Sequence, residues 1–251
     1  MNRVVLSLNL LITAALLLTA GHSVAEEIRV AAASNFSGAI TALAEGFEAD
    51  TGHEVTLIFG STGKHYAQIK HGAPYDAFFA ADKKRPEILE QEGLALPESR
   101  FTYAIGKIVL WSPRADVVDS DGKVLEQGKF RHLAIANPKL APYGKAAQQV
   151  LQTRELWNSL KQKMVRGENI GQTFQFVSSG NAEMGFVAYS QVLRFGRPIE
   201  GSFWEVPQSQ YAPIEQQAIL LKENKTAQDF LLFVKSDRAQ EMIHRFGYGT
   251  P

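Results

Sequence analysis

The chain has 251 residues, with 26 basic and 26 acidic side chains, a formal net charge of zero and no cysteine. The neutral balance argues against a surface that binds a polyanion such as nucleic acid, and the missing cysteines exclude disulfides and thiolate metal sites. The length suits one large domain or two lobes around a sizeable core.

The first 25 residues are expected to form a signal peptide that is removed on export. Arg3 supplies a positive start, an apolar run extends from Val4 to Ala20, and Ser23-Val24-Ala25 supplies the small residues of a cleavage site. Polar residues interrupt the apolar run, which argues against a membrane anchor because a full span needs about 20 apolar residues. The mature chain is expected to begin at Glu26 and to be located in the periplasm.

Strands and helices are predicted to alternate in the first part of the mature chain. Apolar residues spaced three and four apart predict the helices, and short apolar runs predict buried strands. The expected elements are a strand at 28–33, a helix from Phe36 to Phe47 that ends at Gly52, a strand at 55–59, a helix around Tyr66 and Ile69 that stops at Gly72, a strand at 77–80, and a helix with Pro86 in its first turn. This order is typical of an α/β fold.

The segment from Phe101 to Trp111 is predicted to be one longer strand, near which the chain crosses into a second lobe. Further strands are expected at 133–136, 184–187, 203–206 and 218–221, and helices after the Pro142-Tyr143-Gly144 turn, around Phe174 and Val177, and twice near the C-terminus. The predicted division assigns residues 26–105 and 208–251 to lobe 1 and residues 106–207 to lobe 2.

A candidate anion site follows the first strand, at Ala31-Ala32-Ala33-Ser34-Asn35. The small alanines leave room for a ligand, and Ser34 and Asn35 are good N-cap residues at the start of a helix. A helix N-terminus presents unpaired N–H groups to an anion. Ordinary helix capping is the alternative interpretation of the same two residues.

A second candidate follows the next strand, at Phe59-Gly60-Ser61-Thr62-Gly63. It is not a Walker A loop, because Ile58 stands where the first glycine is needed and His65 where Ser or Thr binds magnesium. The segment is either a turn capped by Thr62 or a second cluster of hydroxyl and N–H donors.

Two further turns, Pro142-Tyr143-Gly144 and Glu168-Asn169-Ile170-Gly171, precede helices in the second half of the chain. Tyr143 is either a surface aromatic or a phenol that points into a cleft, and Asn169 is a fair N-cap. Because ligands of α/β proteins gather outside the carboxyl ends of strands, all four turns are expected at one site.

Catalytic signals are weak in this sequence. The six histidines have no metal-ligand spacing, and no Gly-x-Ser-x-Gly nucleophile elbow is present. His65 lies close enough in sequence to Ser61 to activate its hydroxyl, which keeps an exported hydrolase as a rival hypothesis.

At these residues the sequence resembles the periplasmic molybdate-binding proteins of bacterial ABC importers, over essentially all of the mature chain. The segments that carry the resemblance are Ala31 to Phe36, Phe59 to Gly63, Gly72 to Asp82, Pro138 to Gly144, and Gly180 to Tyr189. The resemblance implies a type II periplasmic binding protein fold, with two α/β lobes joined by crossing strands and a ligand cleft between them.

The resemblance also implies the contacts with the ligand. The family's contacts fall on Ser34 with Asn35 beside it, on Thr62 or Ser61 depending on the register of the loop, on Tyr143, and on the backbone of Ile170. Members with alanine at the position of Tyr143 supply a tyrosine from a later segment. Ala188 matches that later position and Tyr189 comes one residue late, so we expect the phenol from Tyr143.

The implied function is capture of molybdate, with tungstate bound comparably, and delivery to the membrane permease of an ABC importer. The implied protein is a monomer that needs no cofactor, holds no free metal cation, binds no nucleic acid and catalyses no reaction. A binding protein for another tetrahedral oxyanion, such as sulfate or phosphate, is the closest alternative, and the exported hydrolase is a more distant one.

Overall fold

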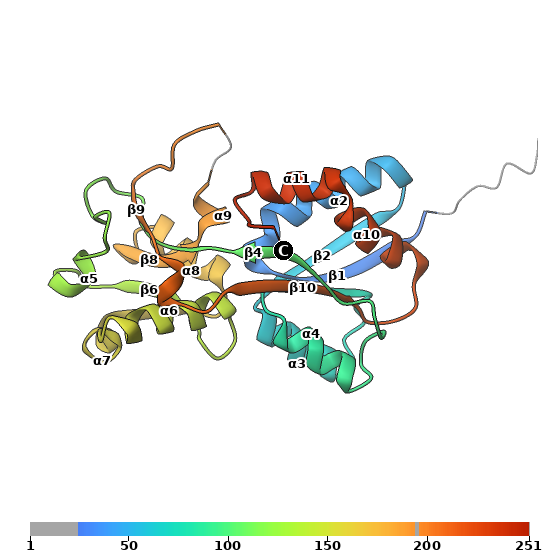
Figure 1. Cartoon of the computed structure of the whole chain (residues 1–251), viewed down its shortest axis with the longest axis horizontal. Coiled ribbons are helices and arrows are strands. Elements are labelled where there is room, and N and C mark those ends of the chain that lie inside the picture. Colours follow the sequence, from blue (N-terminus) through green and yellow to red (C-terminus); the bar gives the residue numbers. More distant parts are fainter. Residues whose placement is uncertain (1–24, 194–195, 251) are drawn as a thin grey trace, which may run out of the picture.

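Two α/β lobes lie side by side in the computed structural model, which describes residues 25–193 and 196–250 (Figure 1). The predicted α/β architecture is confirmed, since each lobe is built on a five-stranded sheet with helices on both faces. The expected signal peptide, apart from Ala25, lies outside the described residues. No helix in the described part of the chain is both long enough and apolar enough to cross a membrane.

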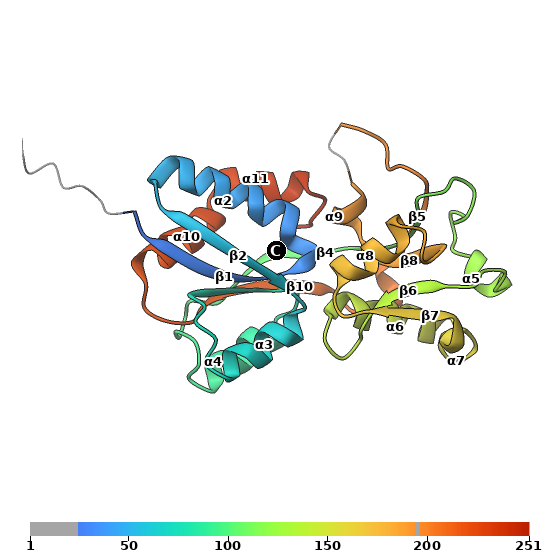
Figure 2. The same ribbon diagram turned by 180° about the vertical axis from the view of Figure 1, so that it is seen from behind.

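The first lobe contains both ends of the described chain. Its elements are β1 (Glu27–Ala33), η1 (Ser34–Phe36), α2 (Ser37–Thr51), β2 (Glu54–Gly60), α3 (Thr62–Lys70), β3 (Ala77–Ala80), α4 (Lys84–Gln91), β4 (Phe101–Gly106), β10 (Ile214–Leu220), α10 (Lys225–Lys235) and α11 (Asp237–Arg245). The sheet order is β2-β1-β3-β10-β4, with β10 antiparallel to both neighbours. Helices α2, α10 and α11 cover one face of this sheet, and α3 and α4 cover the other (Figures 1 and 2).

The second lobe repeats this plan. Its elements are β5 (Ile108–Ser112), α5 (Val124–Gln127), β6 (Leu133–Ala136), α6 (Pro142–Thr153), α7 (Trp157–Leu160), η2 (Lys161–Lys163), β7 (Met164–Gly167), α8 (Ile170–Ser178), β8 (Met184–Ala188), α9 (Tyr189–Val192) and β9 (Ser202–Glu205), and η3 (Gln208–Gln210) follows on the way back. The sheet order is β7-β6-β8-β5-β9. Figure 2 shows α8 and α9 on one side of this sheet and α6 and α7 on the other.

The prediction of one strand from Phe101 to Trp111 is wrong. The chain forms β4 and β5 there, on either side of Lys107, and each strand belongs to a different sheet. β4 pairs with β10, whereas β5 pairs with β8 and β9. Apolar residues continue through both strands because both are buried, and the only mark of the crossing is the exposed Lys107.

Two other expected boundaries differ from the structure. The strand predicted at 218–221 begins earlier, at Ile214, because the polar Gln216 and Gln217 are buried within it. The residues Pro142 to Gly144 form the first turn of α6 rather than a turn before it, since proline is tolerated at the first helical position.

The turn after β1 is held by aromatic packing. The ring of Phe36 lies 4.5 Å from that of Tyr103 and 5.4 Å from that of Tyr248, measured between centroids. Phe36 is fully buried, and burying a side chain of this size contributes about 1.5–3 kcal/mol. The ring therefore anchors Ser34 and Asn35, which immediately precede it.

Candidate functional site

Four chain segments leave the carboxyl ends of parallel strands and meet between the lobes. β1 leads into η1 and β2 into α3 in the first lobe, and β6 leads into α6 and β7 into α8 in the second. The strand registers set Ala33 beside Gly60 and Ala136 beside Gly167. This is the edge at which α/β proteins gather their ligands.

A small cavity lies where these segments meet. Its lining consists of Ala33, Ser34, Asn35, Gly60, Ser61, Thr62, Ala81, Ala141, Pro142, Tyr143 and Ile170. The six residues predicted to contact an anion are all in this set, four from the first lobe and two from the second. The cavity volume is about 10 Å³, against roughly 300–1,000 Å³ for sites that take drug-sized molecules. The cavity therefore suits one compact ion, and none of its lining residues is charged.

Three hydroxyl groups of this cavity are arranged to donate hydrogen bonds. Ser61 Oγ accepts from the N–H of Lys64 at 3.3 Å, and Thr62 Oγ1 accepts from the N–H of Ala81 at 3.0 Å. The phenol oxygen of Tyr143 accepts from Gln216 Nε2 at 3.4 Å. Each hydroxyl already accepts a hydrogen bond from the protein, so its own hydrogen is left for a ligand.

Burial keeps the phenol of Tyr143 in its donating form. Tyr143 is 1% exposed, and desolvation raises its pKa well above the usual value. The phenol therefore stays protonated at any pH near neutrality, and it acts as a donor toward an anion.

Helix N-termini add partial positive charge to the site, together with the backbone donor of Ile170. Thr62, Pro142 and Ile170 are the first residues of α3, α6 and α8, respectively, and all three line the cavity. Within the described residues, the N–H of Ile170 has no hydrogen-bond acceptor. Three helix dipoles thus place partial positive charge around a cavity whose lining includes no charged side chain.

Ser34 joins the two lobes at the edge of the cavity. Its hydroxyl donates to Asn169 Oδ1 at 3.2 Å and accepts from the N–H of Gly171 at 3.2 Å. Asn169 also caps α8 by accepting from the N–H of Gln172, as the sequence predicts. The sequence alone does not predict the contact of Ser34 with the start of α8, because no local pattern relates two segments 135 residues apart.

The side chain of Asn35 is turned away from the ligand position and into a buried polar network. Asn35 Nδ2 donates to Gln216 Oε1 at 2.7 Å and to the Tyr248 hydroxyl at 3.2 Å. Both amide hydrogens are thereby used, so the backbone N–H is what Asn35 has left for an anion. Gln216 touches both Asn35 and Tyr143, and it therefore orients one cavity residue from each lobe.

Gln216 and Tyr248 were not found by sequence reasoning. Gln216 lies between Pro213 and the strand predicted at 218–221, outside every predicted element. Tyr248 reaches the site because Gly249 pairs with Ile105 of β4 and returns the end of the chain to the crossing. Its hydroxyl donates to the carbonyl of Asn35 at 2.7 Å.

The predicted caps need correction. Neither Ser34 nor Asn35 caps a helix, because both lie inside the 3-10 turn η1, and the N-caps of η1 and α2 are Ala33 and Phe36. The N-cap of α3 is Ser61 rather than Thr62. Thr62 is left to bind the N–H of Ala81, which ties α3 to the end of β3.

Direct hydrogen bonds and an ion pair hold the lobes together around the cavity. The N–H of Gly63 donates to the carbonyl of Leu140 at 2.8 Å, and Lys64 Nζ lies 3.0 Å from Glu168 Oε1. At Gly63 a Cβ atom would lie 2.9 Å from the Leu140 backbone. This close approach requires glycine and exists only while the lobes are in contact.

The other candidates lie outside the cavity. Tyr189 begins α9, and its ring centroid is 5.8 Å from Lys107 Nζ. His65 is buried behind β1, where its ring contacts the carbonyl of Ala32 and the side chain of Gln68, both at 3.2 Å. No hydrogen bond joins the side chains of His65 and Ser61 in the described structure, and residues 25–193 and 196–250 contain no cluster of three or more potential metal ligands.

Comparison with known proteins shows similarity over most of the chain. Residues 28–249 match the family of bacterial extracellular solute-binding proteins. A molybdate-binding protein of Azotobacter vinelandii is 50% identical, covering 90% of each chain, and one of Rhodobacter capsulatus is 45% identical, covering 90% of this chain and 89% of the relative. The solved structure of an A. vinelandii periplasmic molybdate-binding protein superposes with a TM-score of 0.87 at 44% identity, covering 89% of this chain and 99% of that one.

The burial of His65 predicts a pH dependence of stability. Desolvation lowers the pKa of His65 below 6.5 despite its hydrogen bonds to Gln68 and Ala32. The unfolded chain therefore takes up a proton first, and this contribution to stability is lost as the pH falls below about 6.5. Denaturant titrations from pH 7 to pH 5 should show a stability loss that His65→Gln reduces, by at most about 1.4 kcal/mol per pH unit. The exposed His132→Gln is the control, and equal pH slopes in all three proteins would contradict the prediction.

Proposed function

The chain belongs to the family of bacterial extracellular solute-binding proteins, and we propose that it binds molybdate between its lobes and delivers the ion to the permease of an ABC importer. The observation that carries this proposal is the uncharged cavity whose hydroxyls and helix N-termini come from both lobes. Molybdate-binding relatives at 45% and 50% identity support the choice of ion.

The proposed contacts are the hydroxyls of Ser61, Thr62 and Tyr143, the backbone N–H groups of Asn35 and Ile170, and the hydroxyl of Ser34, whose hydrogen must turn from Asn169 Oδ1 to the ion. Each charge-assisted hydrogen bond contributes about 1.5–3 kcal/mol, whereas association and lobe closure cost about 4–15 kcal/mol. Several such bonds together are enough for an affinity near micromolar or tighter.

The chemistry of the cavity favours a fully deprotonated oxyanion. Every proposed contact donates, so a ligand oxygen that carries a proton has no acceptor to bind. Sulfate has the same charge as molybdate, and the cavity separates the two by size, because longer metal–oxygen bonds fill a wider cage. Tungstate, with nearly the size of molybdate, binds comparably on this proposal.

Several further properties belong to this proposal. The mature chain is periplasmic after removal of residues 1–25, and the lobes divide into residues 26–105 with 208–251 and residues 106–207. The protein acts as a monomer, since one chain supplies both halves of the cavity. It binds no nucleic acid and performs no chemistry on the ion, which it transfers unchanged.

Calorimetric titration of the mature protein with molybdate, tungstate, sulfate and phosphate tests the proposal. We expect molybdate and tungstate to bind with micromolar or tighter affinity and sulfate to bind at least about 100-fold more weakly. Sulfate or phosphate binding as tight as that of molybdate would assign the protein to another oxyanion. Absence of binding to all four ions would reject the proposed class of ligand.

Replacement of the phenol tests the placement of the tyrosine contact. Tyr143→Phe removes one donor at constant shape, so calorimetry should show molybdate affinity weakened about 10- to 100-fold. The matched control, Tyr189→Phe, removes a hydroxyl outside the cavity and should change affinity less than about twofold. Equal effects of the two substitutions would mean that the phenol contact is misassigned.

Substitution of Gly63 tests whether lobe closure is needed for binding. In Gly63→Ala the added methyl group meets the Leu140 backbone at 2.9 Å, which disfavours the closed form. We expect molybdate affinity to fall at least about tenfold, with stability of the ligand-free protein unchanged or raised, because alanine favours helix. Gly46→Ala, whose Cβ has only ordinary contact at 3.4 Å from Phe233, is the control. Unchanged affinity in Gly63→Ala would show that this lobe contact is dispensable.

A further inference from the structure

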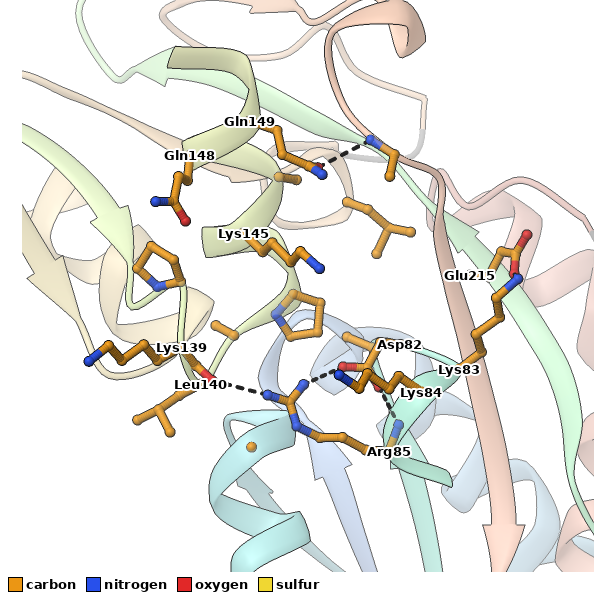
Figure 3. A pocket seen from close by; sticks show the side chains of 18 of the residues that line it. Asp82, Lys83, Lys84, Arg85, Lys139, Leu140, Lys145, Gln148, Gln149 and Glu215 are labelled. Atoms are coloured by element: carbon orange, nitrogen blue, oxygen red, sulfur yellow. Dashed lines mark hydrogen bonds and ion pairs between the residues drawn. The ribbon is translucent and has the colours of Figure 1, made fainter. Parts of the chain in front are cut away.

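A large pocket opens between the lobes next to the small cavity. It has a volume of about 800 Å³, and its walls come from α3 and α4 of the first lobe, from β10, and from the segment that leads from β6 into α6 (Figure 3). Ala81, Ala141 and Pro142 line both the pocket and the cavity. The two spaces are therefore separated by a wall of three small or rigid apolar residues.

Positive charge predominates in this pocket. Its lining contains Lys83, Lys84, Arg85, Lys139 and Lys145, against two acidic residues, Asp82 and Glu215. Both acidic side chains already form ion pairs, Glu215 with Lys83 and Asp82 with Arg85. Within the described residues, the other three lysines have no ion-pair partner, which leaves a local excess of three positive charges.

Two of these three ammonium groups face the interior of the pocket. Figure 3 shows Lys145, on α6, and Lys84, on α4, pointing into the space from opposite walls, whereas Lys139 points away from it. Arg85, next to Lys84 on α4, donates from Nη2 to the carbonyl of Lys139 at 3.1 Å, so it spans the two lobes. The free ammonium groups are thus presented to a small ion inside a recess.

The charge of the pocket contrasts with the rest of the molecule. The whole chain has a net charge of zero, and the small cavity has no charged lining residue. Hydrogen-bond donors and helix ends act over short distances, since the dipole effect falls off within a turn. Attraction of a dianion from solution therefore depends on fixed charge outside the cavity, and charge in a recess concentrates counter-ions most effectively.

We propose that this pocket is an outer anion-binding station, at which Lys84 and Lys145 hold a tetrahedral oxyanion dianion before it moves past Ala81 and Pro142 into the cavity. This inference rests on the proposed function, because it takes the same ion as ligand. A recess with its ammonium groups turned inward suits a small ion, whereas an acidic protein surface needs charges that project outward. The station raises the association rate and contributes little to the final complex.

Stopped-flow measurement of molybdate binding tests the station, with tryptophan fluorescence as the signal. We expect the double variant Lys84→Gln/Lys145→Gln to associate about tenfold more slowly at low ionic strength, with a dissociation rate changed less than twofold. The deficit should shrink as salt is added, because salt screens the attraction in the parent protein. The control is Lys161→Gln/Lys235→Gln, which makes the same change in net charge with one exposed lysine from each lobe outside the pocket.

The outcomes separate this inference from the proposed function. If the parent protein binds none of the oxyanions in calorimetry, the proposed function fails and the station fails with it. If the parent protein binds molybdate but both double variants associate equally fast, the station alone is overturned. A Lys84→Gln/Lys145→Gln variant that changes only the dissociation rate also overturns the station. The same holds if this variant associates normally but impairs transport, which would assign the two lysines to contact with the permease.

Discussion

The cavity depends on hydroxyl groups that each already accept a hydrogen bond from the protein. Ser61, Thr62 and Tyr143 accept from Lys64, Ala81 and Gln216, which orients each hydroxyl and leaves its single hydrogen to give to a ligand. A site of this kind attracts an anion without opposing charge, and it discriminates against any ligand that must donate. The polarity of the whole site thus follows from three hydrogen bonds that no ligand touches.

Two of these hydrogen bonds form within the first lobe, and the third, from Gln216 to Tyr143, joins the two lobes. The first lobe orients Ser61 and Thr62 through the start of α3, and the second orients Tyr143 through the start of α6. Gln216 on the return strand β10 then couples the lobes, since it touches Asn35 on one side and Tyr143 on the other. The contact between the lobes therefore also sets the geometry of the donors.

Local pattern was sufficient for the alternation of strands and helices and for the four segments at the strand ends. The sequence pattern failed to predict the structure where contacts with residues distant in sequence determine it. Lys107 divides one apolar run between two sheets, and Gln216 is buried in a strand only because Asn35, Tyr103 and Tyr143 surround its amide. The cap predicted at Ser34 failed for the same reason, because Ser34 bonds to α8 rather than to its own helix.

A neutral cavity beside a cationic pocket allows the protein both to capture the ion and to release it. A lysine inside the cavity would attract the dianion whether the lobes were open or closed, and so it would oppose delivery. Donors divided between two lobes lose their convergence as soon as the contact between Gly63 and Leu140 opens. Fixed charge is then useful only outside the cavity, where it acts on the approaching ion. Lys84 and Lys145 lie there, in the adjacent pocket.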